Sequence, residues 1–534
     1  MKSRSVCGLV GLWGLLVVVS IACRPPIPID ETRYLSVAWE MWRSGNFLVP
    51  QVNGLPYSHK PPLLFYLINL GWMLFGANAF TARLTAPLFA LCNLGLTAAL
   101  GRRLWPENPR VAEFAPFILL ALPLWAVTST VTMFDQLLTF FILLGLIGLL
   151  KISRWQWRSG LMLLAIAIGG GLLTKGPVVL LPLLPTALSF PWWRPAAAAK
   201  KKYWYPLLLA ALLAGIGLAL GWALPAARAG GPAYADAILW GQTAGRIVKS
   251  FAHQRPWWWY LPLLPLVLLP WTVLLVRGPE KGWRGLLAEP GLRFCLAWLL
   301  PAFILFSLVS GKQLHYLVPL LPALALLGAR AADGAAPQTL RWCRISLGGL
   351  FLVSGLVLAG SGLLPLVNEF TGHRNPLWVL ALIFSGLLAC GLKPEKPATT
   401  ITGISAAVVG WILLLQFIAA GSLAGTFDLG PMALKIAELQ RQGHQVAIYP
   451  ARFANQFHFP GRLRQPLITL DEIHEVGPWL AAHPKAYIVT FRRNLSPDND
   501  SGPPELTLES GKRRISLWSA TALQPLLPPP LTTE

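Results

Sequence analysis

The sequence predicts an all-α polytopic membrane protein that carries a small α/β domain at its C-terminal end. Apolar residues make up 55% of the 534 residues and charged residues only 12%, with a mean hydropathy of +0.56. A soluble protein is typically about 25% charged. Apolar runs long enough to cross a bilayer recur as far as residue 421, and shorter amphipathic or alternating segments follow after residue 430.

The positions of the basic clusters predict about 13 membrane-spanning helices. Every even-numbered span ends at a group of Lys or Arg, as cytoplasmic helix ends do. This alternation requires that the short apolar run 61–77 does not cross, so we expect an interfacial or re-entrant helix there. The expected spans are 6–23, which we expect to be retained, and 80–101, 113–130, 136–150, 159–173, 176–192, 204–224, 259–276, 290–309, 314–329, 345–366, 376–392 and 401–421.

The chain divides at the last predicted span. Residues 1–425 are expected to form the transmembrane domain, with an external loop at 24–79, and residues 426–534 an external α/β domain with a Pro-rich tail. In this second domain the pattern predicts helices and strands in alternation. The helices are expected at 433–442 and 473–482, and the strands at 445–449, 467–470, 486–491 and 514–518.

The net charge of +22 does not indicate nucleic-acid binding. Much of it lies in short loops between apolar runs, where it sets the topology and some of it faces the lipid bilayer, and no basic run accompanies a nucleic-acid-binding motif. The six cysteines lie in or beside apolar segments without CxxC or zinc-type spacing. They predict neither a disulfide framework nor a metal site.

Carboxylates and cations are expected to converge on the external side of the membrane. Such groups are costly at a membrane unless they meet each other or a ligand. Mixed charges of this kind suit a site that handles a phosphate and activates a hydroxyl. The topology places on this side Asp30, Glu31, Arg33, Tyr57, His59, Lys60, Asp135, Lys175, Arg246, Lys249, His253, Arg255, Lys312, His315 and Tyr316.

Each of these positions also has a simpler structural interpretation. Asp30 is compatible with a helix N-cap, with Glu31 in the first turn, and Asp135 with another helix start. Lys60 and Lys312 are compatible with anchors that reach the lipid head groups. A turn explains the Gly and Pro that follow Lys175, but it does not explain the charge.

The long loop before the aromatic run 257–260 carries several basic residues, among them Arg246. They are suited to binding a lipid phosphate. A metal site built from His59, His253 and Asp30 is conceivable, but the spacing is not diagnostic. No metal ligand is therefore assigned, no cofactor is required, and a divalent metal ion is left open.

Several of these motifs resemble the bacterial aminoarabinose transferase branch of the protein O-mannosyltransferase superfamily. The resemblance runs from about residue 8 to 330 and is strongest up to Lys175. The motifs that carry it are Asp30-Glu31-Thr32-Arg33, the stretch 57–61, Asp135, Leu173-Thr174-Lys175-Gly176 and the stretch 311–319. It implies an integral membrane glycosyltransferase of the GT-C type, in the bacterial inner membrane with its site facing the periplasm. Such enzymes take a sugar from a polyprenyl-phosphate donor and usually invert the anomeric centre.

The resemblance also implies residue roles. Asp30 would be the catalytic carboxylate and Asp135 the second acidic residue of the site. Arg33 and Lys60 would neutralise the lipid phosphate, which is also the leaving group. The pocket would further include Lys175, Tyr57 and Tyr316, with Glu31, His59, Lys312 and the loosely matched Arg246 as further substrate-binding candidates. One departure is His59, because the aminoarabinose enzymes have an acidic residue there, which weakens the inference of a bound metal and of an aminoarabinose sugar.

The acceptor is left open between a lipid A-like glycolipid, another cell-envelope glycan and a protein. A flippase or transporter for lipid-linked sugars is the main alternative function, and it predicts charges through the bundle midplane and broken helices in matched halves. The charges fall on one face and no internal repeat is visible, which favours an enzyme. A third alternative is a non-catalytic membrane assembly protein with the C-terminal domain as its binding module.

Overall fold

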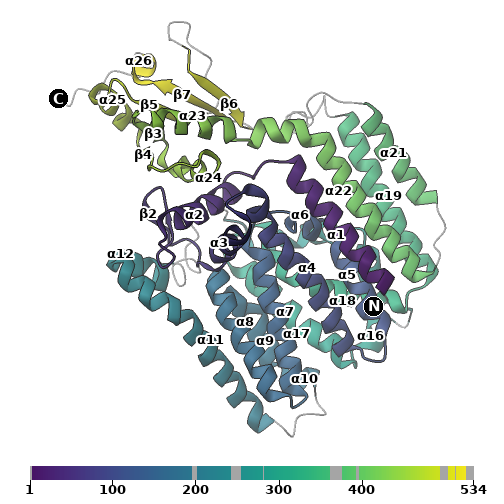
Figure 1. Ribbon diagram of the computed structural model, residues 1–534. Helices are drawn as coiled ribbons and strands as arrows, with labels where there is room; N and C mark the ends of the chain where they lie inside the picture. The colour runs from purple at the N-terminus through teal and green to yellow at the C-terminus, as the bar shows by residue number, and fades with distance from the viewer. Residues whose placement is uncertain are drawn as a thin grey trace.

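A computed structural model describes residues 3–194, 201–241, 254–280, 282–360, 376–391, 396–492, 503–510 and 513–524. In these ranges a large bundle of helices carries a small domain with a β-sheet at one end (Figure 1). The predicted fold class is confirmed. The bundle contains α1 Ser3–Cys23, α4 Ala79–Leu104, α5 Pro109–Leu120, α6 Pro123–Thr128, α7 Phe134–Ser153, α8 Trp157–Lys175, η1 Gly176–Val179, α9 Leu180–Leu188, α10 Phe190–Trp193, α11 Lys201–Gly230, α12 Pro232–Asp236, η3 Ala237–Gly241, η4 Trp257–Leu263, α14 Leu264–Val267, α15 Thr272–Arg277, α16 Gly282–Leu286, α17 Pro290–Leu308, η5 Leu314–Leu320, α18 Leu321–Asp333, α19 Pro337–Ala359, α21 Pro376–Gly391 and α22 Pro397–Phe427.

Nine candidate membrane spans lie within the described ranges, so the chain is a multi-span membrane protein, but the count of 13 spans is not confirmed. Proline accounts for two of the differences. The expected span 113–130 is divided into α5 and α6 just before Pro123, and the expected span 259–276 is broken into η4, α14 and α15 around Pro262, Pro265 and Pro270. Proline has no amide hydrogen to donate and its ring clashes with the preceding turn, so long helices break there.

Helix α7 is the most enclosed of the candidate spans, and it packs closely on α8. Gly148 of α7 and Gly160 at the start of α8 permit this approach. A Cβ added at Gly148 would lie 2.9 Å from the carbonyl oxygen of Gly160. Small residues at such a crossing let two membrane helices approach closely. At the other end of this antiparallel pair, the first turn of α7 lies beside the last turn of α8, where Lys175 donates to Asp135.

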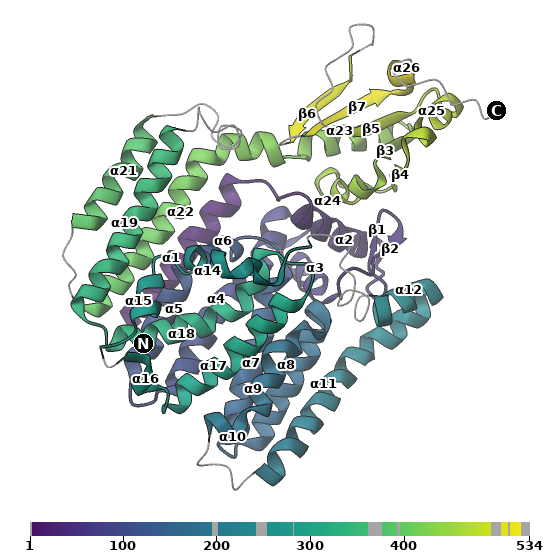
Figure 2. The same cartoon turned by 180° about the vertical axis from the view of Figure 1, so that it is seen from behind.

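Two helices and a hairpin form the segment between the first two bundle helices. They are α2 Asp30–Ser44, β1 Gln51–Val52, β2 Leu55–Pro56 and α3 Leu63–Phe75. At 1.5 Å per residue, the 13 residues of α3 extend about 20 Å, less than the ~30 Å hydrocarbon core of a bilayer. This length agrees with the prediction that run 61–77 does not cross. Figure 2 shows α2 and α3 between the bundle and the small domain.

The C-terminal domain is built on a five-stranded sheet with strand order β4-β3-β5-β7-β6. Strand β3 runs parallel to β4 and β5, whereas β7 is antiparallel to β5 and β6. The predicted helices and strands of this domain are found, but β6 and α24 were not predicted. The elements are α23 Gly430–Arg441, β3 Val446–Tyr449, η7 Ala451–Gln456, α24 His458–Gly461, β4 Ile468–Thr469, α25 Ile473–Ala482, β5 Tyr487–Arg492, β6 Leu506–Ser510, β7 Arg513–Ser519 and α26 Ala520–Leu523.

The C-terminal domain docks on the segment between α1 and α4 through α24 and the residues that connect α24 to β4. The indole nitrogen of Trp39 in α2 donates to the carbonyl of Leu463 at 3.1 Å. Asn53 in the hairpin exchanges two hydrogen bonds with the backbone of Leu467, at 2.7 and 3.0 Å. Because each bond joins segments more than 400 residues apart in sequence, α2 is held between the bundle and the C-terminal domain.

Candidate active site

Asp30 is the first residue of α2, and two side chains from the next turn hold its carboxylate. Its Oδ1 accepts hydrogen bonds from Arg33 Nη2 at 2.5 Å and from the Tyr34 hydroxyl at 3.2 Å. Residues three and four positions apart lie on the same face of a helix, so this geometry follows from the sequence spacing. The Asp30 side chain is 42% exposed. The carboxylate is therefore oriented and also accessible.

The N-cap interpretation of Asp30 is wrong. The N-cap position belongs to Ile29, which makes no side-chain capping bond. The first turn is closed by backbone bonds, from Glu31 N to the Ile27 carbonyl at 3.1 Å and from Arg33 N to the Ile29 carbonyl at 3.2 Å. The Asp30 carboxylate is consequently not used for capping and faces the side chains of Arg33 and Tyr34.

The environment keeps both partners of Asp30 in their donor forms. Burial raises the pKa of Tyr34 well above its usual range, and the Asp30 carboxylate raises this pKa further. Burial lowers the pKa of Arg33, but Tyr57, Tyr34 and Asp30 outweigh that effect, so the pKa of Arg33 lies above its usual value. Asp30 thus lies between a neutral phenol and a guanidinium.

A second charged group surrounds Asp135 in the first turn of α7. Lys175, the last residue of α8, donates a hydrogen bond from Nζ to Asp135 Oδ1 at 2.7 Å. His315 Nε2 in η5 lies 4.0 Å from Asp135 Oδ2. The Lys175 ammonium also lies over the ring of Tyr316, 4.7 Å from its centre. Three helices therefore contribute their ends to a cluster of partly buried side chains around one buried carboxylate.

An aromatic group joins the two carboxylates. Tyr34 packs edge-to-face on Phe134 with ring centres 5.0 Å apart, and Phe134 directly precedes Asp135. Phe65 in α3 contacts both rings, at 6.3 Å from Tyr34 and 5.6 Å from Phe134. Lys60 Nζ lies 5.8 Å from the centre of the Phe134 ring. The structure thus brings Asp30, Lys60 and Asp135 together, as the sequence predicted.

Tyr57 and His59 follow the hairpin β1–β2 and complete this face of the site. The Tyr57 ring is buried and lies 6.0 Å from Phe65 and 5.4 Å from the His59 ring. The hairpin fixes the start of this stretch, since Tyr57 N donates to the Pro50 carbonyl at 2.7 Å. Both residues therefore lie beside the Asp30 and Lys60 side of the cluster.

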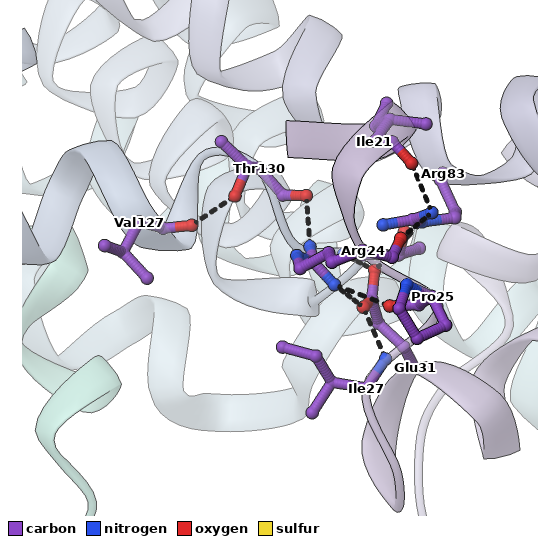
Figure 3. Close-up of polar contacts among 9 residues, drawn as sticks. Ile21, Arg24, Pro25, Ile27, Glu31, Arg83, Val127 and Thr130 are labelled. Atoms are coloured by element: carbon purple, nitrogen blue, oxygen red, sulfur yellow. Dashed lines mark hydrogen bonds and ion pairs between the residues drawn. The ribbon is translucent and has the colours of Figure 1, made fainter. Parts of the chain in front are cut away.

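Glu31 lies away from this accessible face, in a buried ionic clamp with Arg24 and Arg83 (Figure 3). Arg24 Nη1 donates to Glu31 Oε2 at 2.6 Å, and Arg83 Nε lies 3.8 Å from Glu31 Oε1. Arg24 Nη2 also donates to the Thr130 carbonyl, and Glu31 Oε1 accepts from Thr132 N, at 2.8 and 2.9 Å. The clamp joins the start of α2 to the segment that leads into Asp135, so Glu31 acts on the scaffold rather than at the accessible face.

One other predicted binding residue, Lys312, is not brought to the cluster. Lys312 is 3% exposed, and its Nζ donates to the carbonyls of Arg255 and Val309 at 3.0 and 2.5 Å. It fastens the end of the long loop to the segment before η5. Arg246 lies outside the described residues, as do Lys249 and His253.

Sequence reasoning missed two residues of the site. Tyr34 donates to Asp30 from the i+4 position, and that spacing was available in the sequence. His315 was grouped with the other candidate residues but received no role, because only the folded chain shows that η5 brings it to Asp135. Within the described ranges, no group of three or more His, Cys, Asp or Glu residues is arranged to hold a metal ion.

Comparisons with known proteins place this chain in a family. Residues 59–221 match the family described as dolichyl-phosphate-mannose-protein mannosyltransferase. An undecaprenyl phosphate-alpha-4-amino-4-deoxy-L-arabinose arabinosyl transferase of Serratia proteamaculans is 31% identical over 400 residues, which is 71% of each chain. A transferase of the same name from Pseudomonas fluorescens is 28% identical and covers 94% of this chain and 95% of its own length.

Solved structures show the same fold. The crystal structure of ArnT from Cupriavidus metallidurans bound to undecaprenyl phosphate superposes with a TM-score of 0.75 at 20% identity, over 97% of this chain and 98% of that one. Its apo form also superposes with a TM-score of 0.75, at 18% identity. The similarity includes the C-terminal domain, since both comparisons extend over nearly the whole chain. Together with the sequence identity, this shows that the chain belongs to the undecaprenyl phosphate-aminoarabinose arabinosyl transferase family of integral membrane glycosyltransferases.

Proposed function

We propose that this protein transfers a sugar from a polyprenyl-phosphate donor to a cell-envelope acceptor, on the periplasmic side of the bacterial inner membrane and with inversion at the anomeric carbon. The observation that carries the proposal is Asp30, an accessible carboxylate held by Arg33 and Tyr34 beside the cluster of Lys60, Asp135 and Lys175. The relatives are named for the transfer of a sugar from undecaprenyl phosphate.

The chemistry requires a base and a cationic phosphate site. Asp30 accepts the proton of the acceptor hydroxyl as the oxygen attacks the anomeric carbon, and the bond from that carbon to the phosphate oxygen breaks. The departing polyprenyl phosphate carries the negative charge, which Arg33 and Lys60 stabilise. General base catalysis by a positioned carboxylate typically contributes 10²–10⁴-fold, and fixed cations at the developing charge contribute further.

In this mechanism Asp135 and Lys175 support the transfer as a pair. The cation of Lys175 is fixed by Asp135 and by the Tyr316 ring, so it can face a phosphate without reorganising. The sequence leaves open whether a divalent metal ion takes part in the transfer. Chelation followed by readdition of Mg²⁺ or Mn²⁺ tests it, with loss and recovery of transfer as the result that supports a metal.

The position of the charges favours an enzyme over a flippase. Asp135 lies in the first turn of α7, Lys175 ends α8, and His315 lies at the start of η5, so all three are at helix ends. A transporter of lipid-linked sugars is expected to place such groups near the midplane. The C-terminal domain docks on α2, the helix that carries Asp30. This position suits a domain that supports the catalytic site, whereas an assembly protein would use the domain to present an exposed binding surface to a partner.

Mass spectrometry of surface glycolipids and glycans tests the proposed function. We expect cells that contain the protein to carry a glycosylated species absent from cells without it, and purified protein in proteoliposomes to form that species from a polyprenyl-phosphate sugar. Retention of the donor's anomeric configuration in the product would contradict the inverting mechanism. Movement of intact donor across the vesicle membrane without any glycosyl product would instead support a flippase.

A further inference from the structure

Arginines gather at the end of the helix bundle that is opposite the C-terminal domain. Arg102 and Arg103 lie in the last turn of α4, Arg154 directly follows α7, and Arg194 directly follows α10. Figure 1 shows α10 at this end of the bundle. Because α4 and α7 are candidate membrane spans, these residues lie where two spans end. We call these four residues the arginine cluster.

Contacts within the arginine cluster bring like charges together from three helices. Arg154 donates a hydrogen bond from Nη2 to the Arg103 carbonyl, which joins the end of α7 to the end of α4. Burial and the nearby Arg154 guanidinium both lower the pKa of Arg194. Like charges that are close to one another repel, and the repulsion is stronger where water is partly excluded. The fold therefore holds these guanidinium groups together against their mutual repulsion.

No carboxylate of the described residues balances the arginine cluster. Within the described ranges, none of its four members forms an ion pair. Glu289 lies beside the end of α4, where it accepts a hydrogen bond from Trp105, but it pairs with Arg330 at 2.6 Å. Arg194 Nε is buried and has no hydrogen-bond partner among the described residues. The cluster thus has donors and positive charge to offer to an anion.

Exposed tryptophans surround the arginine cluster. Trp155 and Trp157 follow Arg154 in the turn into α8, and Trp192 lies two residues before Arg194. Their exposed fractions are 44%, 39% and 45%. Tryptophan is enriched in membrane proteins at the level of the lipid head groups, where its ring meets the acyl chains and its N–H meets water. The neighbouring arginines are therefore expected at the level of the lipid phosphates, which favours a lipid over a soluble anion.

Arginine presents a planar fork of donors that matches the oxygens of a phosphate group. Basic pockets between the cytoplasmic ends of membrane helices recognise anionic phospholipid head groups, and the alternation of basic clusters predicts that this end is cytoplasmic. We propose that the arginine cluster binds the phosphodiester of an anionic phospholipid in the cytoplasmic leaflet, which links the ends of α4, α7 and α10. A role in topology alone would not require arginines from three helices to meet. The inference is independent of the proposed transferase function.

Lipid binding by the purified full chain tests the site. We expect wild-type protein to bind phosphatidylglycerol in native mass spectrometry, and Arg194→Gln to raise the Kd about tenfold, because a charge-assisted hydrogen bond is lost. Arg110→Gln is the matched control, because Arg110 begins the next helix at the same end but is 66% exposed and pairs with Asp333 at 3.7 Å. An unchanged Kd in Arg194→Gln, or an equal rise in both variants, would overturn the assignment.

Thermal unfolding in nanodiscs separates lipid binding from a purely structural role of Arg194. A ligand that binds only the folded protein raises its melting temperature, so we expect the wild type to melt higher with phosphatidylglycerol than in phosphatidylcholine alone. Arg194→Gln should lose most of this rise. In phosphatidylcholine alone it should be at least as stable as the wild type, because it removes repulsion from Arg154 and, within the described residues, no side-chain hydrogen bond.

Two outcomes of the same measurement would overturn the lipid site. A lower melting temperature of Arg194→Gln already in phosphatidylcholine would show that the arginine supports the fold without a lipid. An equal stabilisation of the wild type by inorganic phosphate in neutral detergent would show that the arginine cluster takes a soluble anion. Either result would leave the proposed transferase function unaffected, because sugar transfer is not the readout.

Discussion

At the scale of single residues, the ion pair of Asp135 and Lys175 is expected to affect both the stability of the fold and the rate of transfer. Asp135 is 2% exposed, and Lys175 is its hydrogen-bonding partner. Removing one member of a buried ion pair leaves an uncompensated charge and typically costs 3–5 kcal/mol. We expect Lys175→Met to lose at least 100-fold in kcat/KM and to lower the melting temperature. Lys175→Arg retains the positive charge, so we expect it to retain more of the activity and a higher melting temperature than Lys175→Met. Equal losses in the two variants would contradict a role for the charge.

The hydroxyl of Tyr34 has a smaller and separable effect. Tyr34→Phe keeps the ring that packs on Phe134 but removes the donor to Asp30. A hydrogen bond to a charged group contributes about 1.5–3 kcal/mol. The expected result is therefore a fall in kcat of roughly ten- to a hundredfold, with little change in melting temperature. Transfer rates under saturating donor measure the effect, and a wild-type rate would show that Asp30 needs no orientation from Tyr34.

At the scale of elements, the clamp of Glu31, Arg24 and Arg83 fixes two segments against each other. Glu31→Gln preserves the shape but leaves two buried guanidinium groups without their counter-ion, so we expect a loss of about 3–5 kcal/mol of stability. Glu509→Gln is the control, because its pair with Arg514 is exposed and contributes at most about 1 kcal/mol. Thermal unfolding in detergent measures both, and similar values for the two variants would contradict the clamp.

The same clamp predicts a pH dependence. Burial alone would raise the pKa of Glu31, but Arg24 and Arg83 outweigh it and hold the pKa below its usual value of 4.5. A lowered pKa in the folded protein means that the clamp contributes fully above pH ~4.5 and is lost only as the pH falls through the lower value. The difference in melting temperature between wild type and Glu31→Gln should thus be constant above pH ~4.5 and shrink below it. A difference that shrinks already near neutral pH would refute this assignment.

The contacts of α24 are expected to hold the C-terminal domain against α2 and α3. Phe459 of α24 stacks on Trp72 of α3 with ring centres 5.3 Å apart, and the Arg462 guanidinium lies 4.1 Å from the Phe459 ring. Phe459→Ala is expected to cost about 3–5 kcal/mol and to make the junction after α22 more sensitive to protease. Leu434→Ala changes an exposed apolar residue of the same domain and serves as the control. Equal protease sensitivity of the two variants would contradict docking through α24.

At the scale of the whole molecule, residue type and topology predicted much of the site but not its geometry. Charged residues at the predicted ends of membrane spans are scarce, which made it possible to identify Asp30, Lys60, Asp135 and Lys175. The alternation of the basic clusters predicted that all four lie on the same side of the membrane. The clamping roles of Glu31 and Lys312 were not predictable, since they depend on Arg83 and on the Arg255 carbonyl, both distant in sequence. The helices and strands of the C-terminal domain followed from local periodicity, whereas the short α24 is fixed by docking contacts.

The placement of the whole bundle was also only partly predictable. Apolar runs located the spans, but the prolines in 113–130 and 259–276 divide two of them into shorter helices. Charge alternation predicted that run 61–77 does not cross the membrane, and the 13-residue length of α3 agrees with this prediction. The result is a molecule in which α2 lies between two domains and presents one accessible carboxylate.

The central claim is that Asp30 is the catalytic base of a lipid-dependent glycosyl transfer. The most direct measurement is the single-turnover rate of sugar transfer by purified Asp30→Asn in proteoliposomes, beside donor binding by the same protein. The account predicts that binding is retained and that the transfer rate falls about 10²–10⁴-fold. Transfer by Asp30→Asn at the wild-type rate would contradict it.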